Sequence, residues 1–295
     1  MTSTRHSLVD ISDLPADTPP GVKSFISTVR LGYSTKKGTF EGWKRAIRRI
    51  AKHAPVIHFT TAVAVGALMR PLLRDMPGGI LYLQGASTTG KSIALRTALS
   101  LRADPSDMTW GFDSMATLKW YTVAAEHNFL CLDDIHMAIL PDNDSGRPVS
   151  SAYLLGFDHW EQSPHATILA TGIPNLRALA GKHLEQAVEI DAQQLPLWPT
   201  PAGMSPWWMD EPLSELRVHY GRAHDRIGDS ISKDADYWTE QYQMNMEQLT
   251  PRIPLPGQRA LFVQASLGLQ WLESHAGVKS DFTVHNALLS KYASD

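Results

Sequence analysis

Cysteine is almost absent from this chain, since Cys131 is the only one among 295 residues. A single cysteine cannot form a disulfide within the chain, so a cytoplasmic protein is the default expectation. An excess of one charge is missing too, because the net charge is −3 and the isoelectric point lies near 6.4. The composition therefore gives no general basic field for nucleic acid, although a local basic patch would be sufficient.

Long hydrophobic runs are also missing. Residues 1–6 lack the apolar stretch of a signal peptide, and the most apolar segment, residues 56–69, is too short to span a bilayer and contains His58. We expect a buried core helix there and no association with a membrane. Hydrophobic residues make up 43% of the sequence and no internal repeat is visible, which predicts one large globular domain or two small ones.

The sequence does contain a G-x-x-x-x-G-K-[ST] motif, known as Walker A, at residues 85–92. Its glycines let the backbone turn tightly around an anion, the N–H groups between them point at phosphates, and the following helix adds its positive dipole end. Lys91 is expected to reach the β- and γ-phosphates, and Ser92 to bind Mg²⁺. The predicted ligands are ATP and Mg²⁺, and the predicted nucleotide-binding residues are Gly85, Ser87, Thr88, Thr89, Gly90, Lys91, Ser92 and Ile93.

The surrounding pattern favours a phosphate-binding loop over an ordinary turn that leads into a helix. A short apolar run at residues 80–83 is typical of a buried strand, and good helix formers follow the motif at residues 93–101. Further strands are predicted at residues 108–112, 128–132, 166–170 and 187–190, with a helix at 114–126. This alternation predicts an α/β fold, a P-loop NTPase of the AAA+/ASCE type with a parallel sheet and helices on both of its faces.

Changes in composition divide the chain into four parts. Residues 1–34 are polar and contain prolines, which predicts a flexible arm, and residues 35–76 predict an N-terminal helical segment. The ATPase core is expected over residues 77–195, and a helical, lid-like C-terminal region over residues 196–295. The helices outside the core are predicted at residues 39–54, 55–73, 212–230, 235–249 and 258–275.

Polar side chains follow two of the predicted strands. Asp133 and Asp134 end a buried strand about forty residues after Lys91, at the sheet edge where ligands of open α/β proteins bind. As a Walker B pair, Asp133 would hold Mg²⁺ and Asp134 would deprotonate the attacking water. Thr171 ends the next strand, where it would sense the γ-phosphate. The structural alternatives are that the two carboxylates cap a loop and that the threonine hydroxyl forms a hydrogen bond within its own turn.

Hydrolysis at an oligomer interface usually needs an arginine that stabilises charge on the transferred phosphoryl group. Arg147 and Arg177 are candidates for this role from a neighbouring subunit, and Arg259 is a candidate second sensor within the same chain. An ordinary surface arginine is the favoured interpretation of each.

Two features could contact DNA. Lys44, Arg48 and Lys52 share one face of a predicted helix, with Arg45 and Arg49 beside it, and such a face can bind a phosphate backbone. A simply solvated face is the more common outcome. Tryptophans that could stack on bases are more often packed against the core; here they are Trp198, Trp207 and Trp208.

These residues resemble domain-of-unknown-function family 927, a family of P-loop ATPase type. Besides residues 85–92, the resemblance rests on Gly38-Thr39-Phe40-Glu41-Gly42-Trp43, Ala124-Ala125-Glu126-His127-Asn128, Leu130-Cys131-Leu132-Asp133-Asp134, Leu169-Ala170-Thr171-Gly172, His219-Tyr220-Gly221 and Gln258-Arg259-Ala260. It runs from about residue 38 to residue 277. The resemblance implies a helicase-like, DNA-associated, ring-forming ATPase of phage, plasmid and other mobile-element proteins, a homo-oligomer such as a hexamer.

The chain departs from the family pattern at three points. Asp134 stands where the family usually has Glu, residues 156–160 shorten a stretch that bears glycine and arginine, and Ala187 replaces an arginine. These departures favour a second hypothesis, a slow, nucleotide-gated oligomeric subunit that controls a protein partner in a defence or transposition complex. A small-molecule kinase is a distant third, because no arginine-rich lid follows Asp134.

Overall fold

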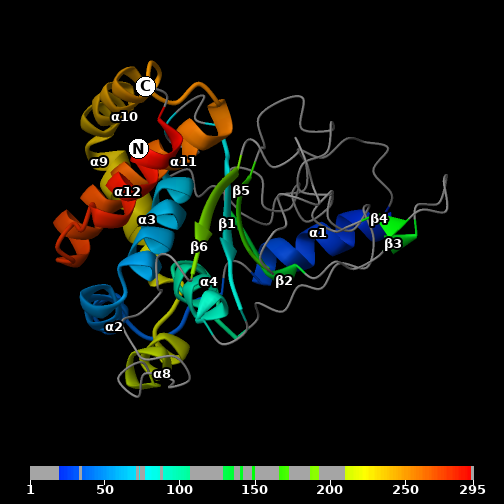
Figure 1. The fold of residues 1–295 in the computed structure, drawn as a ribbon. Coiled ribbons are helices and arrows are strands. Elements are labelled where there is room, and N and C mark those ends of the chain that lie inside the picture. Colours follow the sequence, from blue (N-terminus) through cyan, green and yellow to red (C-terminus); the bar gives the residue numbers. More distant parts are fainter. Residues whose placement is uncertain are drawn as a thin grey trace.

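The computed structural model describes residues 20–32, 35–70, 73, 77–86, 89–106, 129–135, 140–141, 148–149, 166–172, 187–192 and 210–293. In this part of the chain a parallel sheet lies beside a large helical region (Figure 1). Its helices are α1 (Pro20–Gly32), α2 (Phe40–His53), α3 (Pro55–Met69), α4 (Lys91–Leu99), α8 (Asp210–Val218), α9 (Arg222–Lys233), α10 (Ala235–Leu249), α11 (Pro256–Trp271), a π-helical turn η5 (Leu272–Ala276) and α12 (Thr283–Tyr292).

The sheet has four parallel strands in the order β2-β5-β1-β6. They are β1 (Ile80–Gln84), β2 (Phe129–Ile135), β5 (Thr167–Gly172) and β6 (Ala187–Asp191), which confirms four of the predicted strands. Strand β5 therefore separates β1 from β2, and the last residues of β1 and β5 pair, Gln84 with Gly172. A separate short hairpin joins β3 (Leu140–Pro141) to β4 (Pro148–Val149).

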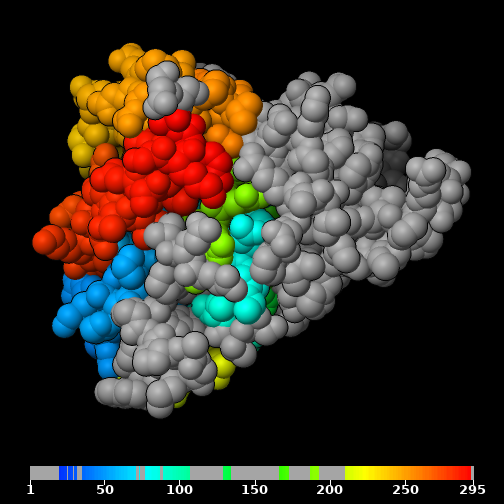
Figure 2. All heavy atoms as spheres, viewed as in Figure 1, coloured from blue at the N-terminus to red at the C-terminus, as the bar shows by residue number. Residues whose placement is uncertain are grey.

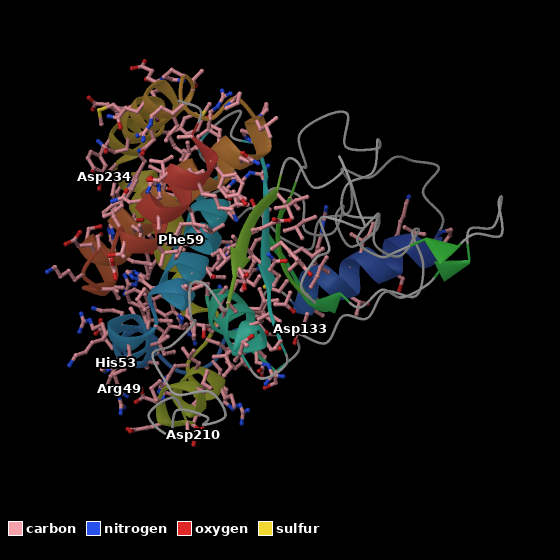
Figure 3. The ribbon with its side chains drawn as sticks, viewed as in Figure 1. Arg49, His53, Phe59, Asp133, Asp210 and Asp234 are labelled. Atoms are coloured by element: carbon pink, nitrogen blue, oxygen red, sulfur yellow. The ribbon has the colours of Figure 1, made fainter. Side chains whose placement is uncertain are left out.

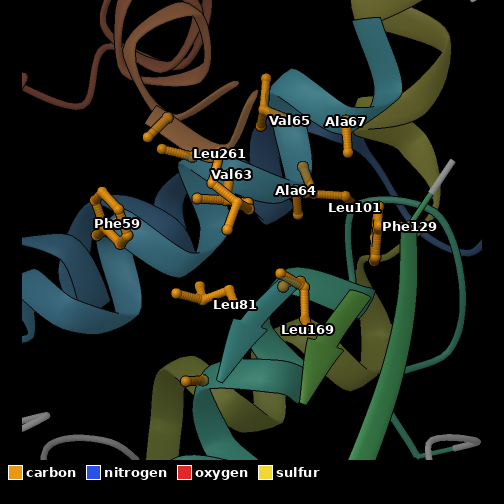
Figure 4. Packing of buried hydrophobic residues seen from close by; sticks show 14 of the residues in the cluster. Phe59, Val63, Ala64, Val65, Ala67, Leu81, Leu101, Phe129, Leu169 and Leu261 are labelled. Atoms are coloured by element: carbon orange, nitrogen blue, oxygen red, sulfur yellow. The ribbon is translucent and has the colours of Figure 1, made fainter. Parts of the chain in front are cut away.

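Helix α3 is the centre of the packing. Every residue after Pro55 in this helix is buried, as its apolar sequence predicts. Figure 4 shows Phe59, Val63 and Ala64 of α3 between Leu81 and Leu169 of the sheet and Leu261 of α11. The helices α2, α10 and α12 gather on the same side of the molecule (Figure 2).

The structure corrects the expectation of a flexible arm over residues 1–34, because residues 20–32 form helix α1. Pro20 stands in its first turn, where a missing N–H costs nothing, and Ile26 is fully buried. The other residues of the arm, apart from this helix, lie outside the described part. The C-terminal helix α12 was not predicted, since its short pattern carries no clear stripe.

The helix predicted over residues 212–230 is also wrong, because it is divided into α8 and α9. Between them, Tyr220 exchanges backbone hydrogen bonds with Lys37 at 3.0 and 3.1 Å, and Gly221 N–H donates to the carbonyl of Ser100. A long-range pairing thus takes backbone groups that a continuous helix would use. The local periodicity of the sequence therefore cannot predict this contact.

Several expectations fall outside the described residues: the strand at 108–112, the helix at 114–126 and the three linker tryptophans. The helices described on the sheet are α3, α4 and α11, so the expected helical layer on the opposite face stays a prediction. No helix in the described ranges is long and apolar enough to cross a membrane.

Helices α3 and α11 approach each other at two glycines, one on each helix. A Cβ on Gly66 would lie 2.2 Å from the carbonyl oxygen of Gln264, and a Cβ on Gly268 would lie 1.9 Å from that of Ala62. Both obstacles are backbone, which cannot rotate away. The close contact that buries α3 therefore requires both glycines.

We expect Gly268→Ala to lower the free energy of unfolding by about 2 kcal/mol or more, because its methyl group forces the helices apart. Chemical denaturation monitored by circular dichroism measures this loss. Gly228→Ala is the matched control, since a Cβ on this α9 glycine would meet nothing within 4 Å; it should be neutral or gain up to about 1 kcal/mol from helix propensity. Equal stability of the two variants would contradict the packing argument.

Candidate functional site

The loop after β1 is shaped by its first and last glycines. Gly85 leaves the strand with φ of 152°, and a Cβ there would lie 2.9 Å from the Cβ of Ala192, just after β6. Gly90 has φ of 91°, which L side chains rarely adopt, and helix α4 begins at the next residue. Atoms of the β1–α4 region reach the face of the molecule drawn in Figure 2.

Lys91 lies inside this loop, with only 9% of its surface exposed. Its ammonium group donates to the carbonyl oxygens of Gly85 at 2.9 Å and Ala86 at 2.7 Å, and more weakly to Thr89 Oγ1 at 3.4 Å. The loop thus wraps its backbone around the ammonium group and fixes a positive charge at the start of α4. An ammonium has three protons and can make three such hydrogen bonds. The longest of the three, to Thr89 Oγ1, is the one that an anion would most easily replace.

Three elements meet at the carboxylate of Asp133. Its Oδ1 accepts hydrogen bonds from Ser92 Oγ of α4 at 2.9 Å and from Thr171 Oγ1 of β5 at 2.8 Å. The predicted metal pair is therefore in direct contact. The contact with Thr171 was not anticipated, since the sequence placed that hydroxyl against a phosphate.

Strand β2 is irregular at this point. Its pairing with β5 shifts register between Leu132 and Ile135, which spans the two aspartates. Such irregularities bend a strand and re-aim its side chains. Asp133 is labelled in Figure 3, beside the sheet and away from α2. The backbone of Asp134 belongs to β2, whereas its side chain lies outside the described set.

Other predicted site residues are placed as follows. Ile93 packs partly buried against the core, and Thr89 Oγ1 donates to Ala86 O at 2.9 Å. Burial raises the pKa of the Cys131 thiol, which keeps this neighbour of the site neutral. Four predicted residues lie outside the described ranges: Ser87, Thr88, Arg147 and Arg177.

One residue that the sequence did not single out borders the loop. Ala192 follows β6, its N–H donates to Gln84 O at 2.9 Å, and its methyl group faces Gly85. A small residue after a strand carries no recognisable signal, so only the assembled sheet reveals this contact.

Arg259 is engaged in the helical region. Its guanidinium donates to the carbonyl oxygens of Ile253 and Pro254, each at 3.0 Å, and to Thr250 Oγ1 at 3.2 Å. These bonds secure the turn between α10 and α11. The structure thus favours a structural role for Arg259 over its candidate role as a second sensor.

The basic face expected on α2 is divided in the structure. Lys44 pairs with Glu41 at 3.0 Å and has only 15% of its side chain exposed, and Arg48 Nε donates to Ala276 O at 2.6 Å. Lys52 is exposed. Two of the three cations proposed for DNA therefore hold intramolecular contacts, and their contact with DNA stays a prediction.

Comparison with known proteins agrees with the resemblance read from the sequence. The family model described as "Domain of unknown function (DUF927)" matches residues 23–117, about a third of the chain, which confirms the resemblance over these residues. They run from α1 through the Gly85 loop and α4. Beyond residue 117 the resemblance stays a prediction, and no curated protein matches the chain.

A solved structure described as "SCCmec type IV Cch - active helicase" has a similar fold. The TM-score is 0.60 at 14% sequence identity, with 88% of this chain and 51% of that chain covered. This chain therefore spans about half the length of that protein. At such low identity the similarity concerns the fold alone, an α/β arrangement with a four-stranded parallel sheet.

The shared carboxylate gives a first test of the site. Thr171→Val keeps the shape of the side chain and removes one hydroxyl donor from Asp133, so we expect a loss of about 1–3 kcal/mol in the free energy of unfolding. Urea denaturation measures it. Thr171→Ser, which retains the hydroxyl, should recover most of the loss. If the Thr171→Val and Thr171→Ser variants were equally stable, the hydrogen bond between Thr171 and Asp133 would not contribute to the free energy of unfolding.

Proposed function

We propose that the chain is a P-loop ATPase with helicase-like function, whose nucleotide site lies at the Gly85 loop and the carboxyl ends of β1, β2 and β5. The observation that carries the proposal is the 2.9 Å contact between Ser92 and Asp133 beside the buried ammonium of Lys91. The strand order adds support, because β5 between β1 and β2 is the order expected of NTPases with an inserted strand and a catalytic acid.

The residues present suit ATP and Mg²⁺. A hydroxyl and a carboxylate are oxygen ligands of the kind Mg²⁺ prefers, and Ser92 and Asp133 would hold it together with phosphate oxygens. Mg²⁺, when bound, neutralises charge on the phosphates. Lys91 would exchange its 3.4 Å contact with Thr89 for one with the β- and γ-phosphates, while the carbonyls of Gly85 and Ala86 keep the ammonium in place.

Asp134 is proposed as the general base that takes a proton from the attacking water. In this proposal the carboxylate of Asp133 serves the metal and that of Asp134 serves the water. Thr171 then acts as a positioning residue, because its hydroxyl fixes the carboxylate of Asp133.

We further propose that this ATPase acts on DNA as a helicase or loader in a phage, plasmid or mobile-element setting, and that it works as a homo-oligomer. The fold shared with the helicase supports the action on DNA, and the mobile-element setting and the homo-oligomer rest on the family resemblance described above. The ATPase core would span residues 77–195, between the N-terminal helical segment and the C-terminal helical region.

A slow, nucleotide-gated subunit that controls a protein partner is the second candidate. Specific observations favour it: Arg259 is held by the turn between α10 and α11, Arg48 is held by the carbonyl of Ala276, and Asp134 is one methylene shorter than Glu. The ATPase rate with and without single-stranded or duplex DNA separates the candidates. Stimulation by DNA supports the first, and a low rate indifferent to DNA supports the second.

Replacing Lys91 by Ala should weaken ATP binding by about ten- to a hundredfold, because the variant loses a charge-assisted hydrogen bond to the phosphates. Titration calorimetry with Mg-ATP measures the affinity. Lys233→Ala, at the exposed end of α9, changes the net charge equally and should leave ATP affinity unaltered. ATP affinity that survives Lys91→Ala would rule out the nucleotide site.

Asp134→Asn should leave Mg-ATP bound but lower the rate of hydrolysis by about a hundredfold or more, because the amide cannot accept the proton of water. Asp134→Glu lengthens the side chain by one methylene. It should raise the rate of hydrolysis on the order of tenfold if the distance between carboxylate and water limits the wild-type rate. Phosphate release in steady state measures both. Full activity of Asp134→Asn would remove this residue from the mechanism.

A further inference from the structure

A second cationic row on α2 is distinct from the face formed by Lys44 and Arg48. Arg45, Arg49 and Lys52 follow one another at intervals of four and three residues, so they lie along one side of the helix. Arg45 and Arg49 face helix α8, whereas Lys52 is exposed one turn further on. We call these three residues the α2 cationic row.

The acidic helix α8 lies antiparallel along this row. Glu215 Oε1 accepts from Arg45 Nε at 2.8 Å, and Glu211 Oε2 accepts from Arg49 Nη2 at 2.5 Å. Glu211 and Glu215 are thus each matched to one guanidinium, at the same four-residue spacing. Figure 3 shows Arg49 and His53 of α2 and Asp210 of α8 at one end of the molecule, away from Asp133.

The outer ion pair of this contact, between Arg49 and Glu211, is weak enough to be exchanged. In the outer pair the side chains of Arg49 and Glu211 are 41% and 68% exposed, and an ion pair so open to water contributes little to stability. In the inner pair Arg45 is 61% exposed, whereas Glu215 is only 19% exposed. Helix α8 buries Pro212 and Leu216, and its Leu213 packs partly buried against the core. A polyanion could therefore displace Glu211 from Arg49 at modest cost and then compete with Glu215 for Arg45, while α8 stays attached through its apolar residues.

The chemistry of the row selects the class of ligand. A carboxylate and a phosphate present similar oxygen pairs to the fork of an arginine, which is why arginine recognises both. We propose that Arg45, Arg49 and Lys52 form a binding site for the phosphate backbone of nucleic acid, which helix α8 covers in the free protein. The ligand rests on the proposed action on DNA, whereas the covering contact stands on the structure itself.

The test removes the cover and leaves the site intact. In the Glu211→Gln, Glu215→Gln double variant, the arginines no longer pair with α8. Fluorescence anisotropy with a labelled single-stranded 20-mer, without nucleotide, should show binding about three- to tenfold tighter than wild type at 50 mM salt. The slope of log affinity against log salt should become steeper by about two units, one for each arginine released.

A charge-matched control separates the site from a general change in charge. Asp236→Asn with Glu240→Gln neutralises two exposed acids on α10 and should leave DNA affinity within about twofold of wild type. Adding Arg45→Gln and Arg49→Gln to the uncovered variant should abolish its gain. The proposal is overturned if the uncovered variant binds no better than the α10 control, or if its gain survives without the arginines.

Two further measurements separate a failure of this proposal from a failure of the proposed ATPase function. Mg-ATP affinity, measured on the same variants by calorimetry, should be unchanged, since none of these residues lies in the Gly85 loop. Tighter DNA binding with no ATP affinity in any variant would support the cationic row and reject the ATPase. ATP turnover without a gain in DNA binding would do the reverse.

Discussion

The burial of helix α3 on all sides is the constraint on which the rest of the fold depends. A helix without a polar face must be covered on every side, and here the sheet and helices α2, α4, α9 and α11 provide that cover. The cover is possible only because α11 approaches within backbone contact at Gly66 and Gly268. Once α3 is enclosed, β1 and β5 have a fixed support, and the loop at the end of β1 has a fixed origin.

The candidate site uses this support in a specific way. Ser92, Asp133 and Thr171 come from one helix and two strands, and a single carboxylate oxygen joins them. Hydrogen bonds to a charged acceptor are stronger than those between neutral groups, so this oxygen links the first turn of α4 to the sheet. A change in the contacts of Asp133 would therefore affect both α4 and the sheet. Such a link is the physical requirement for coupling a bound ligand to conformation.

The sequence could predict what depends on local pattern. The apolar runs predicted β1, β2, β5 and β6, and the all-apolar segment predicted the buried helix α3, because the pattern itself expresses burial. The meeting of Ser92 and Asp133 followed from the rule that strand ends in a parallel sheet share an edge. Their functional roles, like that of Asp134, are not tested by the fold and stay predictions.

What the sequence could not predict depends on partners distant in the chain. The break at Tyr220 requires Lys37, the contact of Arg48 requires Ala276, and the contact of Thr171 with Asp133 requires β2 and β5 to be neighbours in the sheet. In each case a polar group has several possible partners of similar energy, and only the assembled fold selects one. Helix α1 shows the opposite error, since a proline that reads as a breaker stands where a helix begins.

The electrostatics of α2 follow from the same logic. A chain with a net charge of −3 cannot attract a polyanion through its overall field, so any affinity must come from cations gathered on one element. Gathering them on α2 creates repulsion between neighbours, and the acids of α8 relieve that repulsion while the site is empty. A local basic patch and an acidic helix that covers it are thus expected to occur together in a folded, nearly neutral protein, because each reduces the charge repulsion within the other.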